Sequence, residues 1–210
     1  MRPRLIQYFV SCTVLGTGVG LLLLASLGSD GYSTMVNGIA IRSGIPFAAV
    51  NIAVAAGFVL VAWGRGLPPN WSTVVQPTYV GLVINAVLLF HGPSELAWRV
   101  VLLVVAFPVL VVGVAGYLGS GAGAGPFEAA VLSFDPPLPF RWSYSAMQGV
   151  SALIGWALGA SFGVGTALVI FVLGPAVDLV SARFAAFNVH ASGKAAPNTA
   201  LGSPTVPCEI

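Results

Sequence analysis

Six long apolar runs, separated by glycine, proline and polar residues, dominate this chain of 210 residues. A helix that crosses a bilayer needs about 20 mostly apolar residues. We therefore predict membrane-spanning helices at Ile6–Leu27, Phe47–Trp63, Thr73–Phe90, Leu96–Leu118, Tyr144–Phe162 and Thr166–Ala182. Two shorter apolar segments, Tyr32–Ile41 and Phe127–Phe134, follow glycine-rich breaks and predict broken or re-entrant helices. The expected fold class is all-α, a polytopic membrane helix bundle.

The composition points to lipid as the solvent for this surface. Hydrophobic residues make up 57% of the chain and charged residues only 7%, against about 25% charged residues in soluble domains. No polar stretch separates two apolar blocks, so residues 1–185 are predicted to form a single transmembrane domain. Residues 186–210 are rich in Pro, Ser, Thr, Ala and Gly, which predicts a disordered cytoplasmic tail. The net charge of +2 is too small to predict nucleic-acid binding.

Basic residues predict how the bundle is oriented, because cytoplasmic loops carry an excess of Lys and Arg. We count six crossings from a cytoplasmic N-terminus. The cytoplasmic side then receives Arg2, Arg4, Arg65, Arg141, Arg183 and Lys194, and the outside receives Arg42 and Arg99. This asymmetry predicts that both termini are cytoplasmic. The fifth run contains Gln148 and several serines, so counts of four or five spans stay open.

The chain also contains a weak internal repeat. The pattern Thr73, Gly81, Asn85 recurs as Thr166, Gly174, Asp178 at an offset of 93, and Gly28–Ser33 aligns with Gly123–Glu128 at an offset of 95. The repeat divides the chain into two halves, at residues about 5–92 and about 96–183. With three spans in each half, the second half must enter the membrane from the opposite side, as in the inverted repeats of many secondary transporters. The alternative is that Gly- and Val-rich helices resemble one another by composition alone.

Four stretches carry a resemblance to a known family: Gly16-Thr-Gly-Val-Gly20, Leu27-Gly-Ser-Asp-Gly-Tyr-Ser33, Gly163-Val-Gly-Thr166 and Gly174-Pro-Ala-Val-Asp178. Over roughly residues 5–185 the chain resembles the YczE/YyaS/YitT-type bacterial membrane proteins. The second stretch departs from the family's Leu-Gly-x-x-Pro-Trp-Asp pattern, with Gly31, Tyr32 and Ser33 at its last three positions. Glu128 in the second half can supply the acid that Ser33 lacks. The resemblance implies a multi-pass protein of the bacterial inner (plasma) membrane, transporter-like, without an assigned substrate.

Four polar residues are the candidate binding site. Asp30 and Glu128 lie at the two glycine-rich breaks, and Asn85 and Asp178 occupy equivalent positions in the two halves. An ionisable group inside a membrane costs about 2.5–3.5 kcal/mol on insertion scales and usually faces a cavity or a partner. Breaks free backbone groups that lipid cannot satisfy, so they pack within protein or line a wet cavity. We predict that these four residues form a polar site between the halves.

Structural explanations compete with this hypothesis. Asp30 can cap the short helix that follows it, and Asp178 can form an interfacial pair with Arg183. Thr73 and Thr166 follow polar residues or glycine and are predicted to cap their helices. Polar residues that can hydrogen-bond between helices as structural contacts are Asn37, Asn51, Gln76 and Gln148.

Motifs for catalysis are missing from the sequence. His91 and His190 lie in a loop and in the tail, so no metal-binding cluster is predicted. The segment Gly121–Gly125 lacks the Lys-Ser/Thr pair of a phosphate-binding loop. We therefore expect no enzymatic activity, no catalytic residues, no metal and no cofactor.

The leading hypothesis for function is a transporter-like permease that moves a small molecule or ion through a site between the halves. The alternative is a non-transporting membrane partner or scaffold that stabilises or regulates another membrane protein. That alternative predicts no central hydrated cavity and a groove of small residues at the level of the lipid. The expected partners are the lipid bilayer and an unidentified solute, without nucleic acid, and the sequence is compatible with a homo-oligomer.

Overall fold

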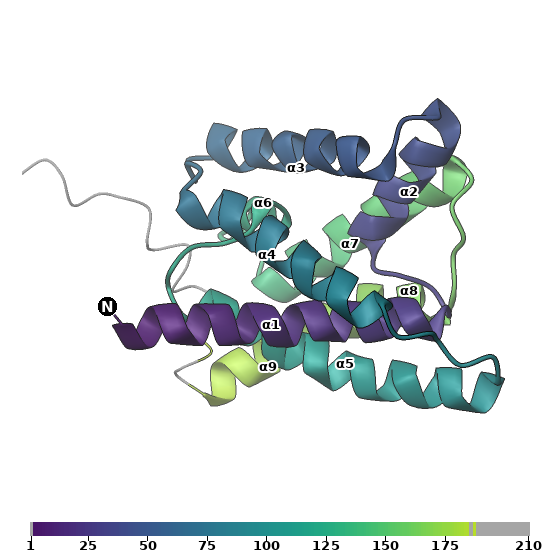
Figure 1. Ribbon diagram of the computed structural model, residues 1–210. Coiled ribbons are helices and arrows are strands. Elements are labelled where there is room, and N and C mark those ends of the chain that lie inside the picture. The colour runs from purple at the N-terminus through teal and green to yellow at the C-terminus, as the bar shows by residue number, and fades with distance from the viewer. Residues whose placement is uncertain (1, 185–186, 188–210) are drawn as a thin grey trace, which may run out of the picture.

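The computed structural model describes residues 2–184 and 187. The regular elements of this part of the chain are all helical, in agreement with the predicted fold class (Figure 1). They are α1 (Arg2–Ala25), α2 (Gly31–Ser43), α3 (Phe47–Gly64), α4 (Trp71–Leu88), α5 (Leu96–Gly119), α6 (Pro126–Leu132), α7 (Phe140–Ala157), α8 (Val164–Leu168), a π-helical turn (Val169–Leu173) and α9 (Gly174–Arg183).

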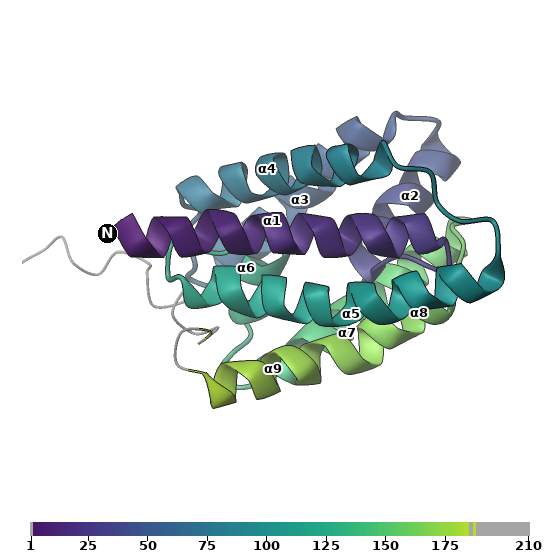
Figure 2. The same ribbon diagram turned by 60° about the horizontal axis from the view of Figure 1, so that its bottom comes forward.

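Helices α1 and α5 form an antiparallel pair along the middle of the bundle (Figures 1 and 2). Near the start of α1, Gln7 Nε2 donates to the carbonyl oxygen of Gly116 near the end of α5, at 3.0 Å. Near the start of α5, Arg99 Nε donates to the carbonyl oxygen of Ala25 at 2.8 Å, and its Nη2 bonds the carbonyl of Ser26. The last carbonyls of a helix lack partners within the helix. Each helix of the pair therefore supplies donors to the end of the other.

Small residues bring the two central helices close together. A Cβ atom on Gly18 would lie 2.9 Å from the backbone nitrogen of Leu110, and one on Gly113 would lie 2.6 Å from Cα of Leu15. Real Cβ contacts are essentially never this short, so the glycines permit a backbone approach that alanine would prevent. The buried core follows this pair and includes Leu15, Leu110 and Val114.

The two short apolar segments form helices, as predicted. Helix α2 has 13 residues and α6 has 7. At 1.5 Å per residue they are about 20 Å and about 10 Å long, too short to cross a bilayer core of about 30 Å. The breaks before them contain Gly28 and Gly123, whose φ angles of +114° and +125° are strained for residues that have a Cβ. These glycines let the chain turn back into the bundle after α1 and α5.

Two predicted spans differ from the structure in detail. Helix α7 begins at Phe140, four residues before the predicted Tyr144–Phe162 span begins, and ends at Ala157, five residues before that span ends. The first N–H of the helix is satisfied by Asp135, whose Oδ2 accepts from the backbone N–H of Phe140 at 3.0 Å. The last predicted span is one continuous helical segment with a π-helical turn that ends at Leu173, two residues before Pro175. Proline removes a backbone donor and crowds the preceding turn, which accounts for the locally wider helix.

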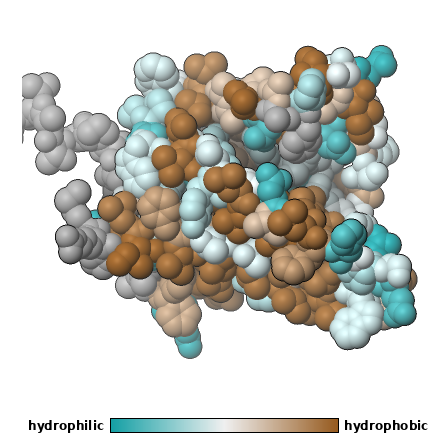
Figure 3. Space-filling model, viewed as in Figure 1, coloured by the Kyte–Doolittle hydropathy of each residue, from teal (hydrophilic) through white to brown (hydrophobic). Residues whose placement is uncertain are grey.

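Three helical segments of the described chain are long and apolar enough to cross a membrane: Arg4–Ala25, Leu96–Gly119 and Val164–Arg183. The surface agrees, because large apolar side chains such as Ile52, Leu82 and Phe171 are 64–73% exposed. Figure 3 shows such hydrophobic residues spread over α1 and α5. Water would oppose this much exposed apolar surface, whereas lipid accepts it. Helices α3, α4 and α7 have 18 residues each, and the count of six crossings stays a prediction.

The described residues form one packed set of helices over most of the range predicted as the transmembrane domain, residues 1–185. The predicted disordered tail at 186–210 lies, except for Phe187, outside the described residues.

Candidate functional site

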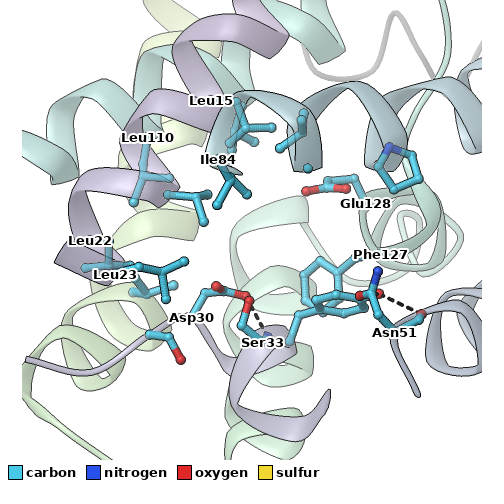
Figure 4. Close-up of a pocket in the computed structure, with 18 of the residues that line it drawn as sticks. Leu15, Leu22, Leu23, Asp30, Ser33, Asn51, Ile84, Leu110, Phe127 and Glu128 are labelled. Carbon is cyan, nitrogen blue, oxygen red and sulfur yellow. Dashed lines mark hydrogen bonds between the residues drawn. The ribbon is translucent and has the colours of Figure 1, made fainter. Parts of the chain in front are cut away.

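A cavity of about 750 Å³ lies between the two short helices α2 and α6 and the helices around them. This volume falls within the range of about 300–1,000 Å³ that is usual for small-molecule sites. Aliphatic side chains of α1, α4 and α5, among them Leu15, Ile84 and Leu110, line one side (Figure 4). The other side carries polar and aromatic groups from the short helices and from α7.

Three of the four predicted site residues line this cavity: Asp30, Asn85 and Glu128. Asp178 does not line it. Leu173 is the last residue of its segment that reaches the cavity, and Asp178 is five residues further on, about 140° around the helix. Asp178 therefore projects from another face of α9, where it is half-buried. The equivalence of Asn85 and Asp178 in the sequence does not bring them to a common site.

Asp30 is the N-cap of α2, as the structural alternative predicted. Its Oδ2 accepts a hydrogen bond from the backbone N–H of Ser33 at 3.0 Å, and its backbone carbonyl accepts from the N–H of Thr34 at 2.9 Å. Capping by a side-chain oxygen contributes about 1 kcal/mol to a helix. The side chain is half-buried and also lines the cavity. Capping and a place in the cavity wall are thus compatible in this residue.

Glu128 is the most deeply buried acid of the cavity. It lies in the first turn of α6, is 8% exposed, and its carboxyl points into the open space in Figure 4. The hydroxyl of Tyr117, on α5, lies beside this carboxyl. Asp30 is close enough for the two acids to interact electrostatically. Asn85, in contrast, is exposed and lies near the end of α4, so it contributes to the rim rather than to the floor.

The sequence hypothesis omitted an amide and tyrosine network beside the acids. Gln148 Oε1 on α7 accepts from the backbone N–H of Tyr32 at 3.3 Å, and Gln148 Nε2 donates to the hydroxyl of Tyr144 at 3.3 Å. The hydroxyl of Tyr32 donates to Oδ1 of Asn51, on α3, at 2.7 Å. All four residues line the cavity. The available signal was an amide inside an apolar run, which the sequence analysis interpreted as a structural contact.

The second amide of the cavity lies against the other break. Gln76, on α4, is buried, and a Cβ atom on Gly125 would lie 2.4 Å from its Oε1 and 3.1 Å from Oε2 of Glu128. Gly31, at the start of α2, is packed in the same way against Oε1 of Gln148, at 2.6 Å from an added Cβ. The start of each short helix therefore abuts the amide of a neighbouring long helix.

Each glycine-rich break packs on the start of a helix from the other half of the chain. A Cβ on Gly28 would lie 2.7 Å from Oγ1 of Thr166, and the N–H of Gly165 donates to the carbonyl of Leu27 at 2.8 Å. A Cβ on Gly123 would lie 2.2 Å from Oγ of Ser72. These contacts hold the ends of both breaks in place next to the cavity.

The expectation for the two threonines is met at one position only. Thr73 completes a capping box, because its Oγ1 accepts from the N–H of Asn70 at 3.1 Å while Asn70 Oδ1 accepts from Thr73. Thr166 is not a cap: Gly163 precedes α8, and the buried hydroxyl of Thr166 has no hydrogen-bond partner among the described residues.

A comparison with models of protein families assigns the chain to a family. The model described as "Family of unknown function (DUF6198)" matches residues 2–182. The chain belongs to this family. A relative from Haemophilus influenzae, named "Uncharacterized protein", is 25% identical over 173 residues, which cover 79% of this chain and 78% of the relative. No solved structure matches the chain. The finer resemblance to YczE/YyaS/YitT-type proteins stays a prediction.

Proposed function

We propose that this DUF6198 protein is a transporter-like permease of the bacterial cytoplasmic membrane, with its solute site in the cavity between α2 and α6. The observation that carries the proposal is the meeting of Asp30, Asn85 and Glu128, which are far apart in the chain, around one cavity of about 750 Å³. The alternative, a non-transporting membrane partner, predicted no central cavity. Acids and amides are costly within a membrane and are usually retained for binding or transport.

The proposed architecture is an inverted repeat of two three-span halves. This proposal is supported by equivalent contacts that α1 and α5 make with each other. Gly18 packs against Leu110 and Gly113 packs against Leu15, and an offset of 95 residues converts one pair into the other. In inverted-repeat transporters the site lies near the midplane at the interface of the repeats, where helices are broken. The cavity and the two short helices fit that position.

The basic residues support the proposed orientation. In Figures 1 and 2 the N-terminus, the start of α4 and the end of α9 lie at one end of the bundle, and the end of α2 and the start of α5 lie at the other. Arg4, Arg65 and Arg183 belong to the first end, and Arg42 and Arg99 belong to the second. An excess of basic residues at the first end favours a cytoplasmic location for both termini.

Cysteine labelling tests the six-span architecture. Cys12 and Cys208 are replaced by serine, and single cysteines are introduced as Pro69→Cys and His91→Cys. Six crossings place residue 91 outside and residue 69 inside, so only the first should react with a membrane-impermeant maleimide in intact cells. If only the three longest apolar helices crossed, residues 69 and 91 would both be outside. Labelling of both in intact cells would therefore contradict the inverted repeat.

Transport is tested in proteoliposomes with solutes chosen from a metabolite screen of a deletion strain. We expect Asn85→Ala and Glu128→Gln each to lower the initial rate, whereas Glu95→Gln, an exposed acid outside the cavity, should leave it unchanged. Insertion is checked by the amount of folded protein in the liposomes. Undiminished transport after changes at Asp30, Asn85 and Glu128 would show that the cavity is not the solute site.

A further inference from the structure

We propose that the cavity selects an organic cation, whose charge is balanced by the carboxylate of Glu128 and whose apolar part contacts the aromatic and aliphatic walls. This inference rests on the proposed function and adds the substrate class to it. Its basis is the combination of a buried acid that points into a large space, the absence of basic residues in the described wall, and the ring surfaces beside the acid.

The charge balance of the cavity is the first argument. The described wall contains the acids Asp30 and Glu128 and no Lys, Arg or His. Asp30 is engaged by Ser33 as a helix cap, whereas the side chain of Glu128 forms no ion pair within the described part of the chain. A carboxylate taken out of water needs a positive partner or strong hydrogen bonds, because the low dielectric of the interior does not stabilise its charge. A bound cation supplies that partner, and an anionic solute would add repulsion.

The neighbourhood of Glu128 offers few other groups that could stabilise its negative charge. The hydroxyl of Tyr117 lies beside its carboxyl, and Tyr117 is itself fully buried. This hydroxyl and the backbone N–H of Glu128 itself do not match the solvation that a carboxylate has in water. Gln76 lies across Gly125 from the same carboxyl, and an amide is neutral. A bound cation would supply the compensating positive charge that these neutral neighbours do not offer.

Aromatic rings make the wall suitable for a cation with an organic body. Phe127 directly precedes Glu128 in the chain. Its ring packs edge-to-face against the rings of Tyr32 and Tyr144, with centroid distances of 5.9 Å and 5.5 Å, respectively. All three line the cavity. Ring faces attract ammonium groups, with estimates of about 0.5–2 kcal/mol for each well-placed ring, and aliphatic residues opposite the rings accept alkyl groups.

A divalent metal ion fits the same site less well. Calcium takes about 6–8 oxygen ligands and magnesium keeps a tight octahedral shell. Among the described residues no group of three or more His, Cys, Asp or Glu side chains comes together. Most of the lining is aliphatic or aromatic, as Leu22, Leu23, Ile84 and Phe127 illustrate in Figure 4. The chemistry therefore favours an alkylammonium group over a bare metal ion.

Binding to purified protein in detergent tests the inference with defined probes. The probes are tetraethylammonium, choline, pivalate as an organic anion, and 3,3-dimethylbutan-1-ol, which has the shape of choline with carbon in place of the charged nitrogen. We expect choline to bind wild-type protein about tenfold or more tightly than its neutral isostere. Equal binding of the isostere, or tighter binding of pivalate, would overturn the inference without use of any variant.

Matched variants test whether the carboxylate that binds the cation belongs to Glu128. Glu128→Gln keeps the shape of the side chain and should weaken tetraethylammonium binding by about tenfold or more. Glu95→Gln makes the same chemical change at an exposed position outside the cavity and should have no effect. Cation binding that survives Glu128→Gln in a protein that melts like wild type would overturn the assignment.

The outcomes separate this inference from the proposed function. If neutral or anionic solutes bind in the cavity and are transported while the cations are not, the substrate class is wrong and the permease proposal stands. If no solute of any charge is transported by the reconstituted protein, the permease proposal fails. Saturable uptake of tetraethylammonium that Glu128→Gln abolishes would support both.

Discussion

Replacement of Gly155 by alanine tests the contact on which the polar wall of the cavity depends. Helices α2 and α7 cross where Gly38 and Gly155 face each other. A Cβ atom added to Gly155 would lie 2.2 Å from the carbonyl oxygen of Thr34. A Cβ atom added to Gly38 would lie 2.3 Å from the carbonyl oxygen of Gly155. The same crossing places Gln148 of α7 at the start of α2. Disturbing it should affect both stability and the geometry of the cavity.

The magnitude follows from the geometry. An ordinary contact between carbon and a carbonyl oxygen is about 3.3–3.6 Å, so the two backbones must separate by roughly 1 Å to admit the methyl group. Forcing extra atoms into a packed interface costs about 1–3 kcal/mol. The obstacle is backbone rather than a flexible side chain, which favours the upper part of this range. Alanine regains about 0.5–1 kcal/mol through its helix propensity, and the net loss is about 2 kcal/mol.

Thermal unfolding in a mild detergent, followed by far-UV circular dichroism, measures the effect. At about 2–4 °C per kcal/mol for a chain of this size, we expect Gly155→Ala to lower Tm by roughly 4–8 °C. Gly57→Ala is the matched control, because a Cβ at Gly57 in helix α3 meets nothing within 4 Å. Its Tm should stay equal to that of wild type or rise slightly. Equal shifts in both variants would refute the close crossing of α2 and α7.

Two further predictions concern the C-terminal end of α1 and the break that follows it. Gly28→Ala should destabilise the protein more than Gly66→Ala in the same melting experiment: both positions have positive φ, but only at Gly28 would the methyl group also meet Thr166. Equal losses would mean that the packing of the first break adds nothing to the backbone strain. Arg99→Gln removes donors from the carbonyls at the end of α1, and we expect a loss of about 1.5–3 kcal/mol, as for hydrogen bonds to charged groups. Arg42→Gln, at an exposed residue, serves as the control, and a comparable loss there would show that Arg99 acts through general charge alone.

Much of the local structure could be predicted from the sequence because hydrophobic length is a local property. The structure contains a helical segment for each of the eight predicted apolar segments, and α5 begins at the predicted residue, Leu96. Asp30 was recognisable as a cap because a short polar side chain before a helix can accept from the exposed N–H groups of its first turn. The bounds of α7 were less accurate, because the turn residues before Phe140 and not apolar length determine where that helix begins.

The composition of the site was less predictable. The repeat identified Asp30, Asn85 and Glu128, which the fold brings to one cavity, but it also suggested Asp178, which the rotation of α9 directs elsewhere. Gln76 and Gln148 are visible as polar residues in apolar runs. Nothing local indicates that they face the starts of α6 and α2, since that contact joins segments more than forty residues apart.

The sequence by itself determined that this is an all-helical chain with lipid-compatible helices, interrupted twice by glycine-rich breaks, since these properties depend on runs of neighbouring residues. Only the tertiary structure decided that α2 packs on α7, that α1 and α5 pair closely, and that Glu128 faces an open space rather than a basic partner. Such contacts depend on helix rotation and on close approach at glycines such as Gly155. Periodicity alone does not specify these, because a helix with apolar residues all round has no single face that must be buried.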